Sequence, residues 1–324
     1  MRPSGPSKMM ARISYESVDT LIYDPVAPNR AATRSALLTL GFRRVETVAS
    51  IDALNDHLQR RPPDLAICEV SGAQDPLCAA IQELRQGLTA YNPFLVVIVT
   101  AWGNLGSLVG NVITAGADDL LLRPFSTSTL EARIRTQVER RKGFVITSDY
   151  VGPDRRRSSH RAGPTELLQA PNSLKMKAKE RITDEVVAER LNRELKVARE
   201  TLTSEKLRRE AFQICVLWRL MQGAEPRAKT QYEVDLVRLC EVTKSLSRRA
   251  RDTDFEEAIA WCDKVLGAIE GLQLGVDRNA SMHLLGHAAL CLIRLFSPEK
   301  SAEEHLNELD ATVALIRSRQ ALAS

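Results

Sequence analysis

Four polar side chains stand where apolar stretches of the sequence end, and their types could support chemistry. They are Asp24, Glu69, Thr100 and Arg123. Glu69 comes near the end of PDLAICEV (63–70), and Arg123 directly precedes Pro124. A guanidinium group is a fixed cation whose planar fork suits a carboxylate. Because Glu69 and Arg123 end neighbouring predicted strands of a parallel sheet, we predict that they form a permanent ion pair with Thr100 nearby. The alternative is a solvated Glu69 carboxylate without a partner.

The segments that position these residues alternate between strand and helix patterns. Strands are predicted at 19–24, 43–50, 64–70, 94–101 and 118–124, and helices at 29–42, 51–61, 75–87, 104–116 and 126–141. The runs DLAICEV and FLVVIVTA are almost continuously apolar, as strands buried on both faces are. Five such β-α units predict an α/β fold in which a parallel sheet is covered by helices on both faces.

The order and spacing of these units resemble a response-regulator receiver domain of the CheY-like type, over about residues 17–142. The resemblance implies a five-stranded, doubly wound (flavodoxin-like) parallel sheet, with a ligand site at the carboxyl ends of the strands. Receivers place an acidic pair after the first strand and a phospho-accepting aspartate after the third. A threonine or serine follows the fourth strand, and a Lys-Pro pair follows the fifth.

This sequence keeps only part of the receiver pattern. Asp24 and Thr100 match it, but Pro25 stands where the family has its second acid. Glu69 takes the phospho-acceptor position, and Arg123 replaces the lysine. Pro25 therefore removes a ligand from a magnesium site, and Mg²⁺ demands near-ideal octahedral geometry. Glu69 is one methylene longer than aspartate, which moves the nucleophilic oxygen by about 1 Å, enough to lower a transfer rate greatly.

These departures predict a degenerate receiver, or pseudo-receiver, with no catalytic residues and no metal or other cofactor. Leu120 occupies the position that serves as an aromatic switch in the family. We expect the Glu69–Arg123 pair to stand in for the phosphorylated state or to lock one conformation. The resemblance places the docking surface for other proteins on the fourth helix, fifth strand and fifth helix.

Residues 143–173 are rich in Gly, Pro, Ser and Arg, which predicts a linker after the receiver-like domain. Its arginines are candidate anion contacts, namely Arg155, Arg156, Arg157 and Arg161. The spacing of Arg157 and Arg161 resembles the arginine motif of cyclic-di-GMP-binding PilZ domains, but the companion DxSxxG motif and a β-barrel pattern are missing. We favour a charged segment on a solvated surface, and the alternative is a segment that docks on the receiver-like domain.

The remainder of the chain has helical patterns. A long helix is predicted over 174–222, and an all-α bundle of four further helices over 225–321, the last with Ser297 as its N-cap. The long helix carries an apolar seam of Ala188, Leu191, Leu195, Ala198 and Leu202. The seam covers about two heptads, so a homodimer stalk and a helix packed within the chain both remain open. Residues 1–16 are expected to form a flexible tail.

His283 and His287 are four residues apart and share one face of a predicted helix. Their surroundings resemble the acceptor motif of phosphotransfer domains, but the lysine of that motif is missing. No third ligand for a metal is obvious. Core or partly buried histidines are therefore favoured over phosphotransfer.

Composition narrows the class of protein. The contents of 44% hydrophobic and 27% charged residues are ordinary for a soluble protein. No apolar run is long enough to span a membrane, and the N-terminus has no secretory signal, which predicts a cytoplasmic protein. The six cysteines form no CxxC pair and are expected to be buried, reduced thiols. Residues 151–210 carry 15 basic and 10 acidic side chains, a weak signal for nucleic-acid binding, and no helix-turn-helix pattern accompanies it.

The sequence therefore predicts a non-catalytic interaction protein of bacterial-type two-component signal transduction. Its expected partners are other signalling proteins, such as a histidine kinase, a phosphotransfer protein or an output protein, with no membrane and no nucleic acid. The alternative is a working phosphorelay protein. That protein would still bind Mg²⁺ and a phosphoryl group, or would transfer phosphate through a C-terminal histidine.

Overall fold

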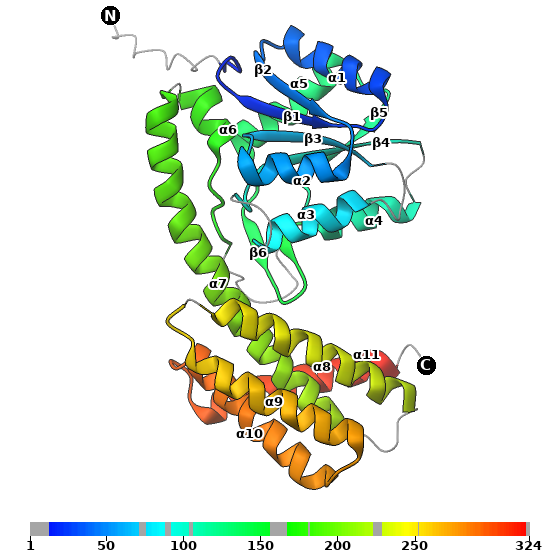
Figure 1. The fold of residues 1–324 in the computed structure, drawn as a ribbon, viewed down its shortest axis with the longest axis vertical. Coiled ribbons are helices and arrows are strands. Elements are labelled where there is room, and N and C mark those ends of the chain that lie inside the picture. Colours follow the sequence, from blue (N-terminus) through cyan, green and yellow to red (C-terminus); the bar gives the residue numbers. More distant parts are fainter. Residues whose placement is uncertain are drawn as a thin grey trace, which may run out of the picture. The chain divides into compact units, whose positions relative to one another are not determined.

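The structure is a computed structural model that divides into two compact units (Figure 1). They are Met1–Glu200, which we call the N-terminal unit, and Thr201–Ser324, which we call the C-terminal unit. The structure describes residues 13–70, 76–87, 92–103, 106–155, 167–180, 182–222, 229–251 and 253–321.

The N-terminal unit is built on a five-stranded parallel sheet in the order β2-β1-β3-β4-β5. Its strands are β1 (Asp19–Tyr23), β2 (Arg44–Val48), β3 (Leu65–Val70), β4 (Val96–Trp102) and β5 (Asp119–Arg123). Its helices are α1 (Ala27–Thr39), α2 (Ile51–Arg60), α3 (Pro76–Gln86), α4 (Gly106–Ala115) and α5 (Thr127–Arg140). The predicted α/β, flavodoxin-like fold class is confirmed.

Two apolar layers cover the sheet, one on each face. One core joins α2, α3 and α4 to the sheet, and the other joins α1 and α5 to it (Figure 1). Successive strand residues alternate between the two cores: in β3, Ala66 and Cys68 face the first, while Leu65 and Ile67 face the second. This alternation also decides which face receives the polar residues at the strand ends.

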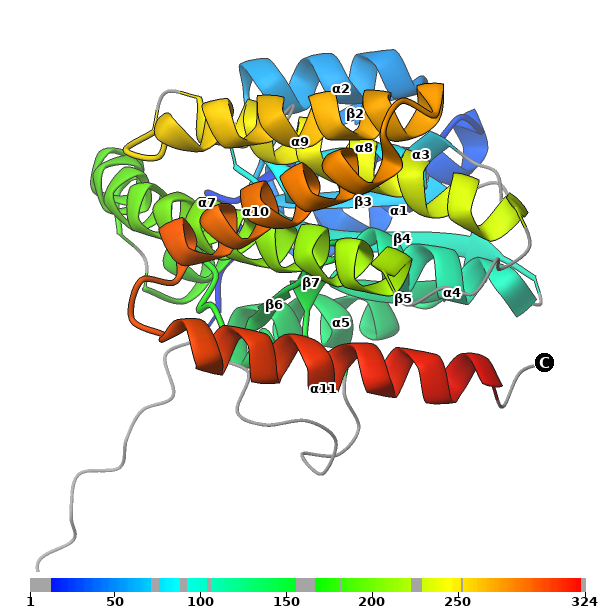
Figure 2. The same ribbon diagram turned by 90° about the horizontal axis from the view of Figure 1, so that it is seen from below.

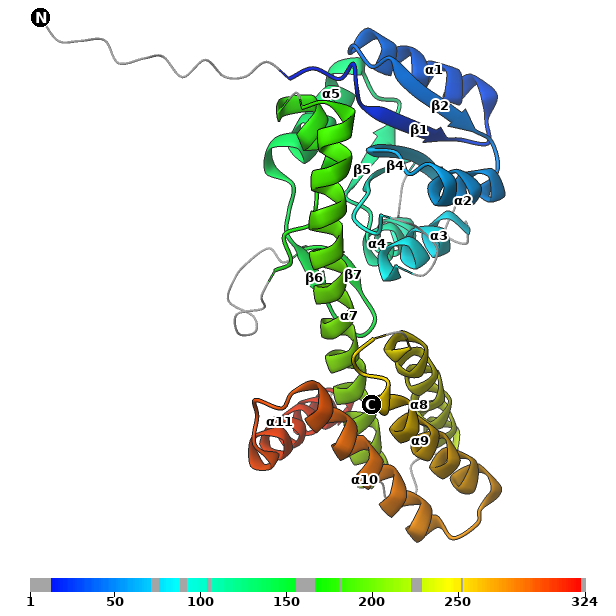
Figure 3. The same cartoon turned by 60° about the vertical axis from the view of Figure 1, so that its left-hand side comes forward.

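The segment after α5 is folded onto the N-terminal unit, so the prediction of a solvated linker is wrong for its described residues. Strand β6 (Phe144–Ile146) pairs antiparallel with β7 (Val151–Pro153) (Figure 3). The Phe144 side chain is completely buried. The hairpin lies against the turn after α4, where a Cβ on Gly152 would come within 2.8 Å of the Gly116 Cα. Gly116 itself has a φ of +93°, a backbone conformation that glycine adopts readily.

Two short helical turns follow and also belong to this unit. They are α6 (Ser173–Lys175) and the π-helical turn η1 (Met176–Glu180). Leu174 and Ala178 enter the core on the α1–α5 face. The predicted tail is likewise wrong for its described residues, because Tyr15 is buried and stacks on Phe42 with ring centroids 4.5 Å apart. Residues 1–12 lie outside the described residues.

The C-terminal unit is helical (Figure 2). Helix α7 (Asp184–Gln222) runs into it, and α8 (Lys229–Ala250), α9 (Glu257–Leu274), α10 (Arg278–Phe296) and α11 (Ala302–Ala321) follow. Helix α7 begins ten residues later than predicted, because η1 precedes it. The prediction of Ser297 as the N-cap of the last helix is wrong, because α11 starts at a capping box formed by Ser301 and Glu304. The Ser301 hydroxyl accepts from the Glu304 N–H, and the Glu304 carboxylate accepts from the Ser301 N–H.

The seam of α7 is covered within the chain over most of its length. Leu195, Ala198 and Leu202 are buried, Leu191 is half-buried and Ala188 is exposed. Buried seam residues support the alternative of a helix packed within the chain. No helix of the described residues has the length and apolarity that crossing a bilayer requires.

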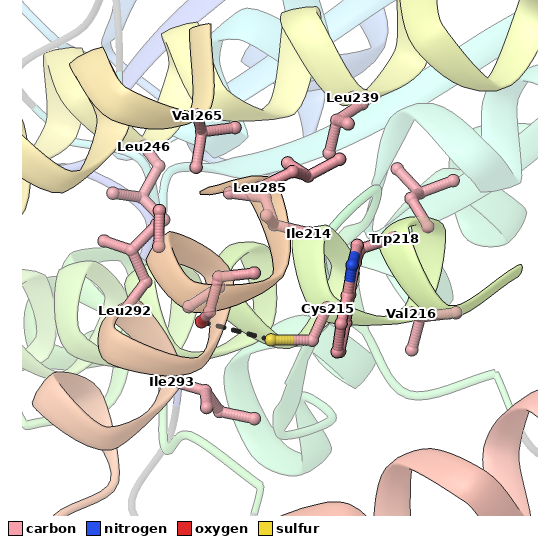
Figure 4. Close-up of a cluster of buried hydrophobic side chains, with 14 of the residues drawn as sticks. Ile214, Cys215, Val216, Trp218, Leu239, Leu246, Val265, Leu285, Leu292 and Ile293 are labelled. Carbon is pink, nitrogen blue, oxygen red and sulfur yellow. Dashed lines mark hydrogen bonds between the residues drawn. The ribbon is translucent and has the colours of Figure 1, made fainter. Parts of the chain in front are cut away.

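The second half of α7 contributes to the core of the C-terminal unit, together with residues of α8, α9, α10 and α11 (Figure 4). Trp218 packs so closely on α10 that a Cβ at Gly286 would lie 2.4 Å from the indole ring. The Cys215 thiol donates to the Ala289 carbonyl at 3.2 Å, and burial raises its pKa. All six cysteines are free thiols.

Candidate functional site

The carboxyl edge of the sheet gathers the four polar residues that end the strands. Glu69 pairs in register with Thr100, and Trp102 pairs with Arg123. Strand β4 separates β3 from β5, so the prediction that Glu69 and Arg123 end neighbouring strands is wrong. Arg123 instead reaches Glu69 past Thr100, because its long side chain spans the width of one strand.

Strand alternation places these side chains on one face. Residues two apart on a strand point to the same face of the sheet. Glu69 therefore points the same way as Leu65 and Ile67, and Thr100 the same way as Val96 and Ile98. Arg123 points the same way as Leu121. All of these apolar residues face the α1–α5 layer. The polar groups therefore converge beneath α1, where water is excluded.

The central interaction is a buried ion pair. Arg123 Nε donates to Glu69 Oε2 at 2.7 Å, and the two side chains are 7% and 5% exposed. The Thr100 hydroxyl donates to the same carboxylate oxygen at 2.5 Å. Glu69 Oε2 thus receives two hydrogen bonds at once, one of them from a cation. The structure therefore contains the pair expected from the sequence, and Glu69 is not the solvated carboxylate of the alternative.

Arg123 also binds residues of the first β-α unit. Its Nη2 donates to Asp24 Oδ2 at 3.3 Å and to the Thr33 hydroxyl at 2.8 Å. Asp24 Oδ1 accepts from the Val26 N–H at 2.8 Å, which fixes the turn into α1. Thr33 was not expected from the sequence. The available signal is its helical spacing to Leu37, since both are buried on one face of α1.

The arrangement does not fit a magnesium ion. Pro25 offers no side-chain oxygen, and both carboxylates, Asp24 and Glu69, already bind a guanidinium group. A cation that shares these ligands would compete with Arg123, whose charge is permanent. Among the described residues, no three His, Cys, Asp or Glu side chains lie close enough together to hold a metal ion.

The fifth strand presents its remaining side chains in two directions. Leu120 is half-buried and packs on the α2–α4 core, whereas Leu122 is 48% exposed. Phe125 follows the strand, and the Arg123 guanidinium carbon lies 4.8 Å from its ring centroid. Trp102, at the end of β4, is 55% exposed. Of these side chains, Phe125 is the one whose ring contacts the Arg123 guanidinium group.

Other predicted site residues lie elsewhere. Arg155 donates to the Ala117 carbonyl, so it docks its segment on the N-terminal unit as the alternative expected. The remaining linker arginines, Arg156, Arg157 and Arg161, lie outside the described residues. His283 and His287 are both exposed on α10, so the expectation of core or partly buried histidines is wrong. Gly286 between them faces the bundle interior and makes room for Trp218, which leaves the two imidazoles on the outside.

A second ionic cluster lies at the opposite edge of the sheet. Asp118 is buried and binds two guanidinium groups, with Arg85 Nη2 at 2.9 Å and Arg141 Nε at 2.8 Å. The Phe144 ring of the β6–β7 hairpin contacts both, with centroids 5.2 and 5.0 Å from the guanidinium carbons. Burial lowers the pKa of Arg85 to about 10, so the group remains charged at neutral pH. This cluster fixes the hairpin to the sheet.

A third ionic contact fixes η1. Lys177 Nζ lies 2.6 Å from Asp19 Oδ2 and 2.8 Å from Asp64 Oδ2, at the start of β1 and just before β3. Burial raises the pKa of Asp64, although Lys177 opposes that shift. The sheet is thus held by charged side chains at both ends, and those at the amino ends of the strands were not indicated by the sequence pattern.

The comparisons with known proteins concern the N-terminal unit. The phosphate regulon transcriptional regulatory protein PhoB of Rhizobium meliloti is 32% identical over 143 residues, which are 39% of this chain and 60% of that protein. The two-component response regulator PhoP of Pseudomonas aeruginosa is 40% identical over 74 residues, 22% of this chain and 31% of that protein. The N-terminal unit is thus similar in sequence to response regulators, and we refer to it below as the receiver-like domain. No protein-family model matches the chain.

The receiver-like domain also resembles solved structures of receivers. HP1043, an orphan response regulator of H. pylori, has 20% identity and a TM-score of 0.32, over 37% of this chain and 96% of its own. A CheY-like response regulator from Mesorhizobium loti has 13% identity and a TM-score of 0.28, over 36% of this chain and 96% of its own. The chain spans 60% of the length of PhoB and 31% of that of PhoP, so the activities of those whole proteins do not transfer to it.

Proposed function

We propose that this chain is a degenerate receiver protein that acts in two-component signalling by binding other proteins. Its function would require neither phosphorylation nor catalysis. One observation supports the proposal: at the phospho-acceptor position, the Glu69 carboxylate oxygen accepts from both Arg123 and Thr100. A carboxylate bound in this way is not free to attack a phosphoryl group or to bind Mg²⁺.

The ion pair would hold the carboxyl ends of β3, β4 and β5 in one arrangement. Glu69, Thr100 and Arg123 belong to these three strands, and all three side chains meet at one oxygen atom. Interiors are close-packed, so such ends move between discrete arrangements rather than continuously. A partner, such as a histidine kinase, a phosphotransfer protein or an output protein, would therefore always meet the same surface of the receiver-like domain.

Phosphodonor treatment of the full chain tests the proposal. We expect no phosphoryl adduct by intact mass spectrometry after incubation with acetyl phosphate and Mg²⁺. We also expect no change in tryptophan fluorescence on addition of beryllium fluoride and Mg²⁺, although Trp102 lies two residues after Thr100. A response regulator with an intact acceptor aspartate serves as the positive control for both measurements.

The phosphorelay alternative predicts the opposite results. A Mg²⁺-dependent adduct on a peptide that contains Glu69 would show that the receiver-like domain still accepts phosphate. An acid-labile adduct on His283 or His287 would show transfer through the C-terminal unit instead. Either adduct would overturn the proposed phosphorylation-independent function.

A further inference from the structure

The outward face of α10 is a second place where side chains capable of chemistry gather. His283 and His287 are both exposed there and are one helical turn apart. Residues four apart on a helix are neighbours on its surface, with about 5–6 Å between their Cβ atoms. Neutral imidazole is the commonest protein ligand for metals and suits zinc, nickel and copper.

We propose that His283 and His287 form a two-nitrogen chelating site for a divalent transition-metal ion of the Zn²⁺, Ni²⁺ or Cu²⁺ class. The remaining coordination positions are open to water or to another ligand. This proposal is independent of the function proposed for the receiver-like domain, because it uses only side chains of the C-terminal unit.

The helix that carries the two histidines is held in place, so their spacing is fixed. Its opposite face is buried in the bundle through residues such as Leu285, Ala289 and Leu292. The Asp277 carboxylate caps its first turn by accepting from the Ala280 N–H at 3.0 Å. Ligands fixed before binding lose less conformational entropy when the ion arrives.

One of the two rings is also restrained by a neighbour. The His287 ring lies against Trp261 of α9, with centroids 5.6 Å apart and planes at 57°. On the same tryptophan, the Lys264 ammonium lies 3.8 Å from the ring centroid. The tryptophan restricts the orientation of the imidazole, while the nearby positive charge lowers the affinity for any cation. Two nitrogen ligands beside an ammonium group disfavour Ca²⁺ and Mg²⁺, which require oxygen ligands.

The site is incomplete by the standard of structural zinc sites, which have four protein ligands. The described residues include no cluster of three metal-binding side chains, so water or an added ligand would occupy the remaining coordination positions. The pair is nevertheless distinctive among the described histidines. His57 lies on α2, far along the sequence, and His305 is buried in α11.

The site is tested by titrating the untagged full chain with NiCl₂ and, separately, with ZnCl₂. The protein is first freed of metal with a chelator and is kept reduced. We expect one ion per chain by calorimetry. We also expect an upward shift in the thermal unfolding midpoint of the C-terminal unit that grows with metal concentration. His283→Ala or His287→Ala should each weaken binding at least tenfold, which corresponds to about 1.4 kcal/mol. The matched control, His57→Ala, should leave binding unchanged.

A rescue variant distinguishes chelation from a general effect of losing a histidine. Asn279 is exposed on α10 and lies four residues before His283. The Asn279→His substitution in the His287→Ala background recreates the spacing and should restore binding. The proposal is overturned if neither ion binds the wild-type chain. Binding that persists in the double variant His283→Ala/His287→Ala would also overturn it, since side chains other than these two histidines would then hold the ion.

Discussion

At the residue scale, the Glu69 carboxylate is the centre of a buried polar network. It lies 2.7 Å from Arg123 Nε, beneath α1 and away from water. Removing ions from water is costly, and a buried pair repays that cost only when its geometry is good and its remaining atoms are bonded. Thr33, Asp24 and Thr100 supply those additional hydrogen bonds.

Loss of the arginine should therefore destabilise the receiver-like domain strongly. Arg123→Met leaves two carboxylates buried without their cation, and we expect a loss of about 3–5 kcal/mol in unfolding free energy. Hydrogen exchange of peptides from β3 and β5 measures it. The matched control is Arg133→Met, because Arg133 pairs with Asp119 on the surface with its side chain 48% exposed. The control should change stability by less than about 1 kcal/mol. Equal losses of unfolding free energy in the two variants would show that the buried ion pair stabilises the domain no more than the exposed one.

At the element scale, the hairpin and η1 convert a segment with linker-like composition into part of the domain. The hairpin supplies Gly152, which approaches Gly116, and Phe144, whose ring contacts the Arg85 and Arg141 guanidinium groups. A chain that ended at residue 142 would lack both contacts. We infer that the folding unit includes the residues up to η1.

The Asp118 cluster predicts a second stability effect. Asp118→Asn keeps the shape but removes the charge between Arg85 and Arg141, and we expect a loss of about 3 kcal/mol or more. Asp119→Asn, one residue on, is the control and should cost under about 1 kcal/mol, because its partner Arg133 is exposed. Chemical denaturation with Trp102 fluorescence reports on this unit. A smaller effect for Asp118→Asn than for Asp119→Asn would contradict the role of the cluster.

Packing of α10 on α7 predicts opposite effects for two glycines. Gly286→Ala puts a methyl group 2.4 Å from the Trp218 ring, and we expect a loss of about 1–3 kcal/mol from overpacking. Gly267→Ala in α9 meets no atom within 4 Å and should stabilise the unit by about 0.4–1 kcal/mol. Thermal unfolding followed by circular dichroism measures both. Stabilisation by Gly286→Ala would show that α7 and α10 are not packed as described.

At the scale of the whole molecule, the two units differ in their sequence similarity to other proteins and in where they bury charged side chains. The similarity to response regulators covers the receiver-like domain, with its charge clusters at both ends of the sheet. The C-terminal unit is an apolar helical core with a few buried charges, among them Glu210, which is 3% exposed. The stability of the C-terminal unit should therefore depend on pH through these buried charges.

Glu210 predicts the direction of that response. Burial raises its pKa, although Arg249 and Lys206 oppose the shift. The folded state then holds the Glu210 proton more tightly than the unfolded state does. The stability that this protonation contributes is fully present below the ordinary pKa of glutamate, about 4.3, and is lost as the pH rises through the pKa of Glu210 in the folded state. Relative to Glu210→Gln, which stays neutral, the wild-type unit should lose stability as the pH rises above about 4.3. Chemical denaturation in a Trp102→Phe background, where Trp218 and Trp261 report, measures the difference. Parallel pH curves for the two proteins would contradict the prediction.

The sequence alone determined the receiver-like fold, because apolar runs of strand length alternate with helical periods and so require a parallel sheet covered on both faces. It also determined that Glu69, Thr100 and Arg123 would meet at one edge, since all three end strands of such a sheet. Composition was a poor guide to residues 143–173. Their Gly, Pro and Arg content is typical of a linker, yet Gly152 packs closely on Gly116 and Arg155 donates to the Ala117 carbonyl.

Only the tertiary structure decided the contacts that depend on strand order and on the third dimension. Strand β4 lies between β3 and β5, so the reach of Arg123 and the participation of Thr33 could not be read from spacing along the chain. The exposure of His283 and His287 was equally hidden, because a helix with apolar residues on several sides does not reveal which face its bundle covers. That face was fixed by Trp218, which needs the absence of a side chain at Gly286 and so turns both imidazoles outward.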